Sequence, residues 1–115
     1  MEPLCLDDLD DAALDRLPFG VVRLSPEGTV ERFNRAESER SGIASWRALG
    51  RDYFGDVNVL NQDWKSYVDG VAPGDRTRVY TKVRAYHRAD DAVIDISRCE
   101  AGRVYLCIRA TGRQA

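Results

Sequence analysis

The spacing of hydrophobic positions changes several times along the chain, and each change marks a predicted element. Leucine and alanine recur at helical spacing over residues 1–17, behind an acidic start, which predicts an amphipathic N-terminal helix. Alternation of polar and apolar residues then predicts two strands at 19–25 and 29–33. Proline and glycine lie between them, as in a tight turn. These two strands are therefore expected to form a hairpin.

Short helices are predicted in the middle of the chain. Asn34 has the character of an N-cap for a helix that runs to Arg40, and Gly42 is suited to end it. A further helical turn is predicted at 46–49. A last helix is expected after Asn61, with one apolar face made of Trp64, Tyr67, Val68 and Val71. We expect both tryptophans, Trp46 and Trp64, to lie in the core or to cover it.

The last third of the chain alternates and predicts three strands, at 76–87, 93–99 and 103–111. A three-residue loop that ends in Gly102 would join the last two strands. This register pairs Ile96 with Leu106, Ile94 with Ile108 and Arg98 with Val104, and it makes one face of the hairpin mostly aliphatic. A two-residue loop would mix the two faces, so the three-residue loop is preferred. In the register of the three-residue loop, Cys107 lies opposite Asp95.

Taken together, the elements predict an α+β fold with one five-stranded antiparallel sheet. The short helices would pack on one face, and the N-terminal helix would cover the other. The 115 residues suit a single domain, with the helix at 1–17 and the core at 18–115.

Composition excludes several classes of function. The chain has 17 basic and 19 acidic residues and a net charge of −2, which argues against a nucleic-acid partner. No apolar run is long enough to span a membrane. The N-terminus lacks the pattern of a signal peptide, so we expect a cytoplasmic protein.

The metal-ligating residue types are few. The chain has an odd number of cysteines without a short repeated spacing, which argues against a disulfide framework and against a zinc site. They are Cys5, Cys99 and Cys107. His87 is the single histidine, and we interpret it as a solvated loop residue. No metal ligands are therefore assigned.

The order of the elements resembles that of PAS domains over nearly the whole chain. More narrowly, four stretches resemble the photoactive yellow proteins. They are Leu17-Pro18-Phe19-Gly20-Val21, Asn34-Arg35-Ala36-Glu37, Gly50-Arg51-Asp52-Tyr53-Phe54-Gly55-Asp56-Val57, and Gly70-Val71. Their common order and spacing carry the resemblance.

This resemblance implies a pocket whose residues can be compared one by one. Leu60 stands where the family attaches its chromophore to a cysteine, and a leucine cannot form a thioester. Glu37 matches the family's buried glutamate, and Phe33 matches the tyrosine beside it. Ser41 matches the supporting threonine, and Ile43 matches the arginine that shields the pocket. The resemblance thus implies a ligand pocket of these five residues, without the light chemistry.

Other cofactors of PAS domains find no match either. Flavin-binding light sensors of this fold carry a reactive cysteine in the helical region after the first pocket wall, where this chain has none. Haem-binding members use a histidine on the long central helix, and 61–72 contains none. We therefore predict no cofactor.

Two roles of Glu37 remain open. As the third residue after Asn34 it has the spacing of a capping box, in which its carboxylate would accept from the backbone of the cap. Alternatively it faces a cavity as a partly buried carboxyl group with a raised pKa.

Three functions remain open as well. The first is a non-catalytic sensory or regulatory module that binds a small ligand and contacts a protein partner or forms a homodimer. The second is an interaction scaffold whose pocket is filled. The third, a small enzyme, is least favoured because no acid/base set converges in the sequence.

Overall fold

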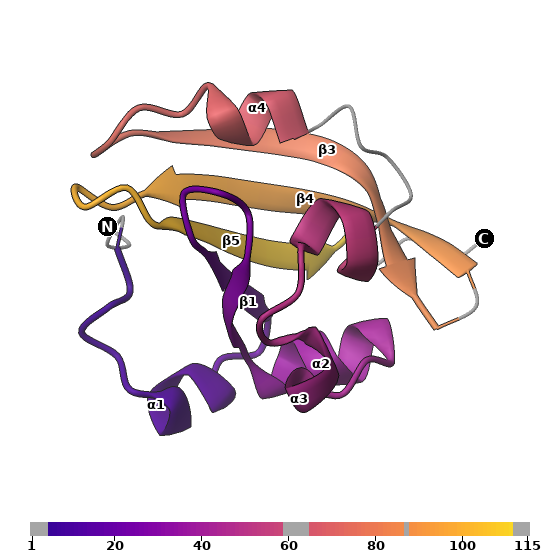
Figure 1. Cartoon of the computed structure of the whole chain (residues 1–115). Helices are drawn as coiled ribbons and strands as arrows, with labels where there is room; N and C mark the ends of the chain where they lie inside the picture. The colour runs from indigo at the N-terminus through magenta and orange to yellow at the C-terminus, as the bar shows by residue number, and fades with distance from the viewer. Residues whose placement is uncertain (1–4, 59–64, 87, 112–115) are drawn as a thin grey trace.

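The computed structural model describes residues 5–58, 65–86 and 88–111. Its strands form one antiparallel five-stranded sheet in the order β2-β1-β5-β4-β3 (Figure 1). The predicted α+β architecture is therefore confirmed, although β4 begins several residues earlier than expected. The strands are β1 Gly20–Leu24, β2 Val30–Phe33, β3 Arg76–Ala85, β4 Arg88–Arg98 and β5 Val104–Ala110.

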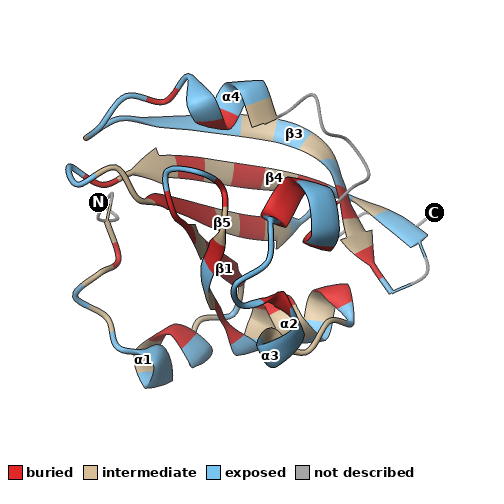
Figure 2. Cartoon of the chain, in the orientation of Figure 1, coloured by how far each residue is buried: buried red, intermediate tan, exposed pale blue. Residues whose placement is uncertain are grey.

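The helices are short, and most pack on one face of this sheet. We call it the inner face; it carries Val22, Ile94, Ile96, Leu106 and Ile108, all fully buried. Buried positions recur along the strands in Figure 2. The helical elements are α1 Asp11–Asp15, α2 Arg35–Ser41, α3 Ser45–Ala48, the π-helical turn η1 Tyr53–Val57, and α4 Lys65–Asp69.

The β4–β5 hairpin has the register that the sequence predicts. Ile96 pairs with Leu106 and Arg98 pairs with Val104. The backbone N–H of Cys99 donates to the carbonyl of Arg103 at 2.8 Å, which closes the three-residue loop. Gly102 has a φ of +99°, a left-handed conformation that favours glycine. Local turn chemistry therefore set this register.

The predicted helix over 1–17 is wrong in extent. Within the described part of this stretch, residues 5–17, only α1 is helical, because the carboxylate of Asp10 accepts from the backbone N–H of Ala13 at 2.8 Å and begins the helix there. Before it the chain turns, with the N–H of Leu9 donating to the carbonyl of Leu6 at 3.0 Å. We call residues 5–17 the N-terminal segment.

The predicted position of this segment is nevertheless confirmed. Leu6 and Leu14 are buried together with Val21 and Tyr105 of the sheet. These strand residues lie on the face opposite the inner face, which we call the outer face. The segment therefore covers the outer face with its leucines, as the sequence predicts, but mostly without helical structure.

Two aromatic predictions are wrong. Trp46 is 76% exposed, because α3 is a single turn that buries Ala48 instead. Tyr67 is 58% exposed, because the five-residue α4 buries only Val68. Asn61, Trp64 and His87 lie outside the described residues. Within the described part of the chain, no helix has the length and apolar character to cross a membrane.

The expectation that the cysteines form no disulfide is also wrong. Cys5 and Cys99 form one, which connects the N-terminal segment to the residue after β4. They are 94 residues apart in sequence, so spacing could not reveal the pair. Cys107 is not part of it and lies opposite Asp95, as predicted.

Candidate functional site

The candidate site begins at the junction between β2 and α2, where Asn34 is buried. Its side-chain oxygen accepts from the backbone N–H groups of Glu37 at 3.1 Å and Val21 at 2.8 Å. Its side-chain nitrogen donates to the carbonyls of Leu14 at 2.8 Å and Phe19 at 3.1 Å. The predicted N-cap is confirmed, and the same side chain also connects α2 to β1 and to the N-terminal segment.

The side chain of Glu37 points into the protein and is 1% exposed. It does not complete a capping box, because the backbone N–H of Asn34 donates to the carbonyl of Val21 at 3.1 Å. Its carboxylate accepts instead from Arg40, through Nε at 2.9 Å and through a short contact with Nη2. A Cβ at Gly20 would lie 2.1 Å from the Glu37 Oε1, so a larger residue there would force the Glu37 carboxylate to move.

Arg40 is the functional candidate that the sequence reasoning missed. Its Nη1 donates to the carbonyl of Arg84 in β3 at 2.8 Å, so the ion pair also connects α2 to the sheet. Glu37 and Arg40 are three residues apart on one helix, a spacing at which side chains meet. That spacing was the available signal in the sequence.

Burial controls the electrostatics of this pair. Burial raises the pKa of Glu37, while the hydrogen bond and the positive charge of Arg40 oppose the increase. Tyr53 in η1 is fully buried nearby, and its burial, together with the charge of Glu37, raises the pKa of its phenol. Asn58, also buried, opposes this increase. We call Glu37, Arg40, Tyr53 and Asn58 the inner polar cluster.

A hollow of about 750 Å³ lies next to this cluster. Arg84 lines it and also accepts from Arg40 through its carbonyl, while its own Nη1 donates to the carbonyl of Val57 at 3.4 Å. The π-helical turn contributes Asp56 and Val57, and such turns are frequent at functional sites. The hollow is lined by Gly42, Ile43, Trp46, Arg47, Arg51, Asp56, Val57 and Arg84.

The four described residues of the predicted ligand pocket do not line one common hollow. Glu37 and Ser41 share the buried side of α2. Ser41 closes the helix end, since its hydroxyl oxygen accepts from the N–H of Ile43 at 3.2 Å. Ile43 lines the hollow described above, whereas Phe33 lines another one between α1 and α2. Leu60 lies outside the described residues, so the pocket of all five residues stays a prediction.

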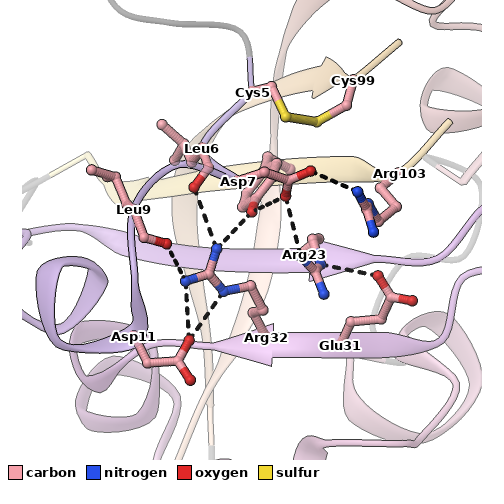
Figure 3. A network of polar contacts seen from close by, with 11 residues as sticks. Cys5, Leu6, Asp7, Leu9, Asp11, Arg23, Glu31, Arg32, Cys99 and Arg103 are labelled. Atoms are coloured by element: carbon pink, nitrogen blue, oxygen red, sulfur yellow. Dashed lines mark hydrogen bonds and ion pairs between the residues drawn. A yellow bond between two sulfur atoms is a disulfide. The ribbon is translucent and has the colours of Figure 1, made fainter. Parts of the chain in front are cut away.

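A second polar constellation holds the N-terminal segment on the outer face (Figure 3). Arg32 of β2 donates to the carbonyls of Leu6 at 3.3 Å and Leu9 at 2.6 Å. It also contacts the carboxylate of Asp11, with Nε 3.1 Å from Oδ1, and donates to the Tyr105 hydroxyl oxygen at 2.8 Å. One guanidinium thus satisfies several acceptors of a segment that is largely not helical.

Asp7 forms the other half of this network. Its carboxylate accepts from the Tyr105 hydroxyl at 2.6 Å, from Arg23 at 3.1 Å and from Arg103 at 2.9 Å. Burial alone would raise the pKa of Asp7, but these hydrogen bonds and positive charges outweigh it and lower the pKa. Close by, the disulfide of Cys5 adds a covalent connection (Figure 3).

Comparisons with known proteins, by sequence and by structure, give the following similarities. No family model matches the chain. Photoactive yellow protein of Rhodothalassium salexigens is 30% identical over 82 residues, which cover 69% of this chain and 66% of that protein. This alignment therefore spans about two thirds of the length of the relative.

Solved structures show the same fold. The photoactive yellow protein domain of the sensor histidine kinase Ppr from Rhodospirillum centenum superposes with a TM-score of 0.73 at 21% identity, covering 90% of this chain and 96% of that domain. The PAS domain of the RpfR quorum-sensing receptor from Cronobacter turicensis, in complex with BDSF, has a TM-score of 0.62 at 13% identity and covers 84% and 96%. The chain has the PAS fold. Within that class it is similar to photoactive yellow protein.

Proposed function

We propose that this PAS domain is a non-catalytic sensory or regulatory module that binds a small ligand beside the inner polar cluster, without a covalent chromophore. The observation that carries the proposal is the buried ion pair of Glu37 and Arg40. It occupies the place where the resemblance puts a chromophore-binding glutamate, next to a hollow of about 750 Å³. PAS domains similar to photoactive yellow protein are usually non-catalytic sensory modules.

The chemistry of the side chains supports a non-covalent guest. Position 60 is a leucine, which offers no thiol. Cys5 and Cys99 are joined to each other near the outer face, and Cys107 lies on that face too. Because Arg40 already holds the carboxylate of Glu37, a guest would meet a neutralised pair rather than a bare charge.

The output would pass through the N-terminal segment to a protein partner or to a second copy of the chain. Asn34 supports this route, because the same amide contacts the first turn of α2 and the carbonyl of Leu14. A ligand that displaced α2 would therefore disturb the contact that holds α1. Docked and released segments would form the two populations whose balance the ligand shifts.

The alternative is a scaffold with no ligand. One observation favours it: Arg40 satisfies the carboxylate of Glu37, and Gly20 approaches the same carboxylate too closely to leave space between them. In that case the domain would act only through its surfaces.

Native mass spectrometry and absorption spectroscopy of the purified chain test the proposal. We expect a retained small-molecule mass and no visible absorption band. Ile43→Trp, which places a larger side chain in the hollow, should weaken retention, whereas Leu49→Trp, on a different hollow, should preserve it. A visible or near-ultraviolet band would show that a chromophore is bound after all. A folded protein with no retained mass would favour the scaffold.

A further inference from the structure

A second pocket, of about 290 Å³, lies on the outer face, on the other side of the sheet from the inner polar cluster. It is close to the lower end of the roughly 300–1,000 Å³ range of small-molecule sites. Its walls come from the N-terminal segment, the start of β1 and strands β3, β4 and β5. The lining residues are Leu6, Leu9, Leu17, Phe19, Arg76, Asp95, Ser97 and Cys107.

The two sides of this pocket differ in chemistry. Leu6, Leu9, Leu17 and Phe19 form an apolar wall. The strands contribute polar groups at neighbouring register positions, since Arg76 pairs with Ser97 and Asp95 pairs with Cys107. An occupant that satisfies both sides must have an apolar body and a polar group.

Several guanidinium groups lie around Asp95 at the polar side. Asp95 accepts from Arg78 at 2.7 Å and 3.1 Å and from Arg109 at 3.0 Å, and the hydrogen bond and charge of Arg78, with the charges of Arg109 and Arg76, lower its pKa although burial opposes this. Asp75 is also near, accepting from the backbone N–H of Arg76 at 3.2 Å. The positive charges of Arg76, Arg78 and Arg109 therefore all act on Asp95 at this side of the pocket. Such a cluster of guanidinium groups favours an anionic group on the occupant.

We propose that this outer pocket binds a small amphipathic carboxylate, with its hydrocarbon part against the leucines and its carboxylate toward Arg76. This site is separate from the one in the proposed function. The proposal for the outer pocket therefore does not depend on ligand binding at the inner hollow. Because the apolar wall belongs largely to the N-terminal segment, an occupant binds the docked segment only and favours docking.

Cys107 supplies a local probe, since it lines the pocket and is not part of the disulfide. The experiment measures the rate at which a maleimide alkylates this thiol in the oxidised full chain, with octanoate or 1-octanol added at constant pH. We expect octanoate to slow alkylation at least about fivefold at saturation. The alcohol should need about tenfold higher concentration, because it lacks the charge-assisted contact.

A matched pair of variants tests the role of Arg76. Arg76→Gln should raise the half-protecting octanoate concentration about tenfold, whereas Lys82→Gln, which removes a cation of the same strand that pairs with Asp91 and does not line the pocket, should change it little. Ile43→Trp should leave protection unchanged, which separates this site from the inner hollow. Absence of protection by octanoate overturns the proposal, as does equal potency of octanol or an equal effect of Arg76→Gln and Lys82→Gln.

Discussion

The two faces of the sheet each hold a carboxylate, and the two carboxylates respond to their surroundings in opposite directions. Glu37 at the inner face is 1% exposed and has one cationic partner, and burial raises its pKa. Asp7 at the outer face has a side chain that is 26% exposed and three donors, and its pKa is lowered. The number of donors relative to the degree of burial therefore decides which charge state the folded protein favours.

The two faces also differ in how readily their polar groups can be exposed to water. The inner pair connects α2 to β3 within the core, so exposing it requires unfolding of that region. The outer network holds a segment with little helix of its own, and its charged groups regain water when the segment leaves. We therefore expect the outer face to change state more readily than the inner face.

The largest expected effect comes from breaking the covalent connection of the outer face. Cys5→Ser should lower the free energy of unfolding by up to about 4–5 kcal/mol, because the disulfide closes a loop of nearly the whole chain. Chemical denaturation of oxidised wild type and variant measures the change. Cys107→Ser is the control and should cost much less. If dithiothreitol leaves the wild-type midpoint unmoved, the disulfide does not contribute as the structure implies.

At the inner face, Arg40→Met should cost about 3–5 kcal/mol at neutral pH, because it leaves the Glu37 carboxylate buried without its cation. The double variant Glu37→Leu with Arg40→Met should recover most of this loss, since it removes both charges together. Denaturation midpoints of wild type, Arg40→Met, Glu37→Leu and the double variant give the coupling between the two side chains. Additive losses would mean that the pair is not energetically coupled.

The pH dependence of Arg40→Met sharpens this test. A folded-state pKa of Glu37 above its ordinary value of 4.5 means that the folded protein holds the proton more tightly than the unfolded chain. Proton binding by Glu37 then contributes to the stability of the fold. This contribution is complete below about pH 4.5 and is lost as pH rises through the folded-state pKa of Glu37. We expect the cost of Arg40→Met to decrease in acid. A cost independent of pH would contradict a buried, unpaired carboxylate.

The smallest effect is expected from Asp7→Asn, which should cost about 1.5–3 kcal/mol through weaker contacts to Arg103 and Tyr105. The pH dependence from Asp7 has the opposite sign to that from Glu37. The lowered pKa of Asp7 stabilises the fold above its ordinary value of 3.8, and this contribution is lost as pH falls through the folded-state value. Hydrogen exchange of the N-terminal segment measures its release.

Asp8→Asn is the matched control for this prediction, because Asp8 is the exposed neighbour of Asp7. It should leave the exchange of the segment unchanged. Added salt should increase exchange in wild type more than in Asp7→Asn, because the contacts of Asp7 are ionic and partly exposed. Equal protection of the segment in Asp7→Asn and wild type would show that the disulfide and Arg32 hold it without Asp7.

Short-range chemistry determined much of this protein from the sequence alone. Asparagine at 34 caps a helix, glycine at 102 closes a three-residue loop, and alternation sets the faces of the β4–β5 hairpin. Each of these depends on a few neighbouring residues, so a single sequence suffices to predict them. The PAS architecture followed from their order.

Tertiary structure alone decided the rest, because these features depend on which distant groups meet. Leucine spacing predicted a helix over the first seventeen residues, but Arg32 satisfies the carbonyls of Leu6 and Leu9, and the chain there needs no helix. Cys5 found a partner 94 residues away. Glu37 turned inward because Gly20 leaves room for its carboxylate and Arg40 compensates its charge. Burial and long-range pairing, rather than local spacing, set the chemistry of both faces.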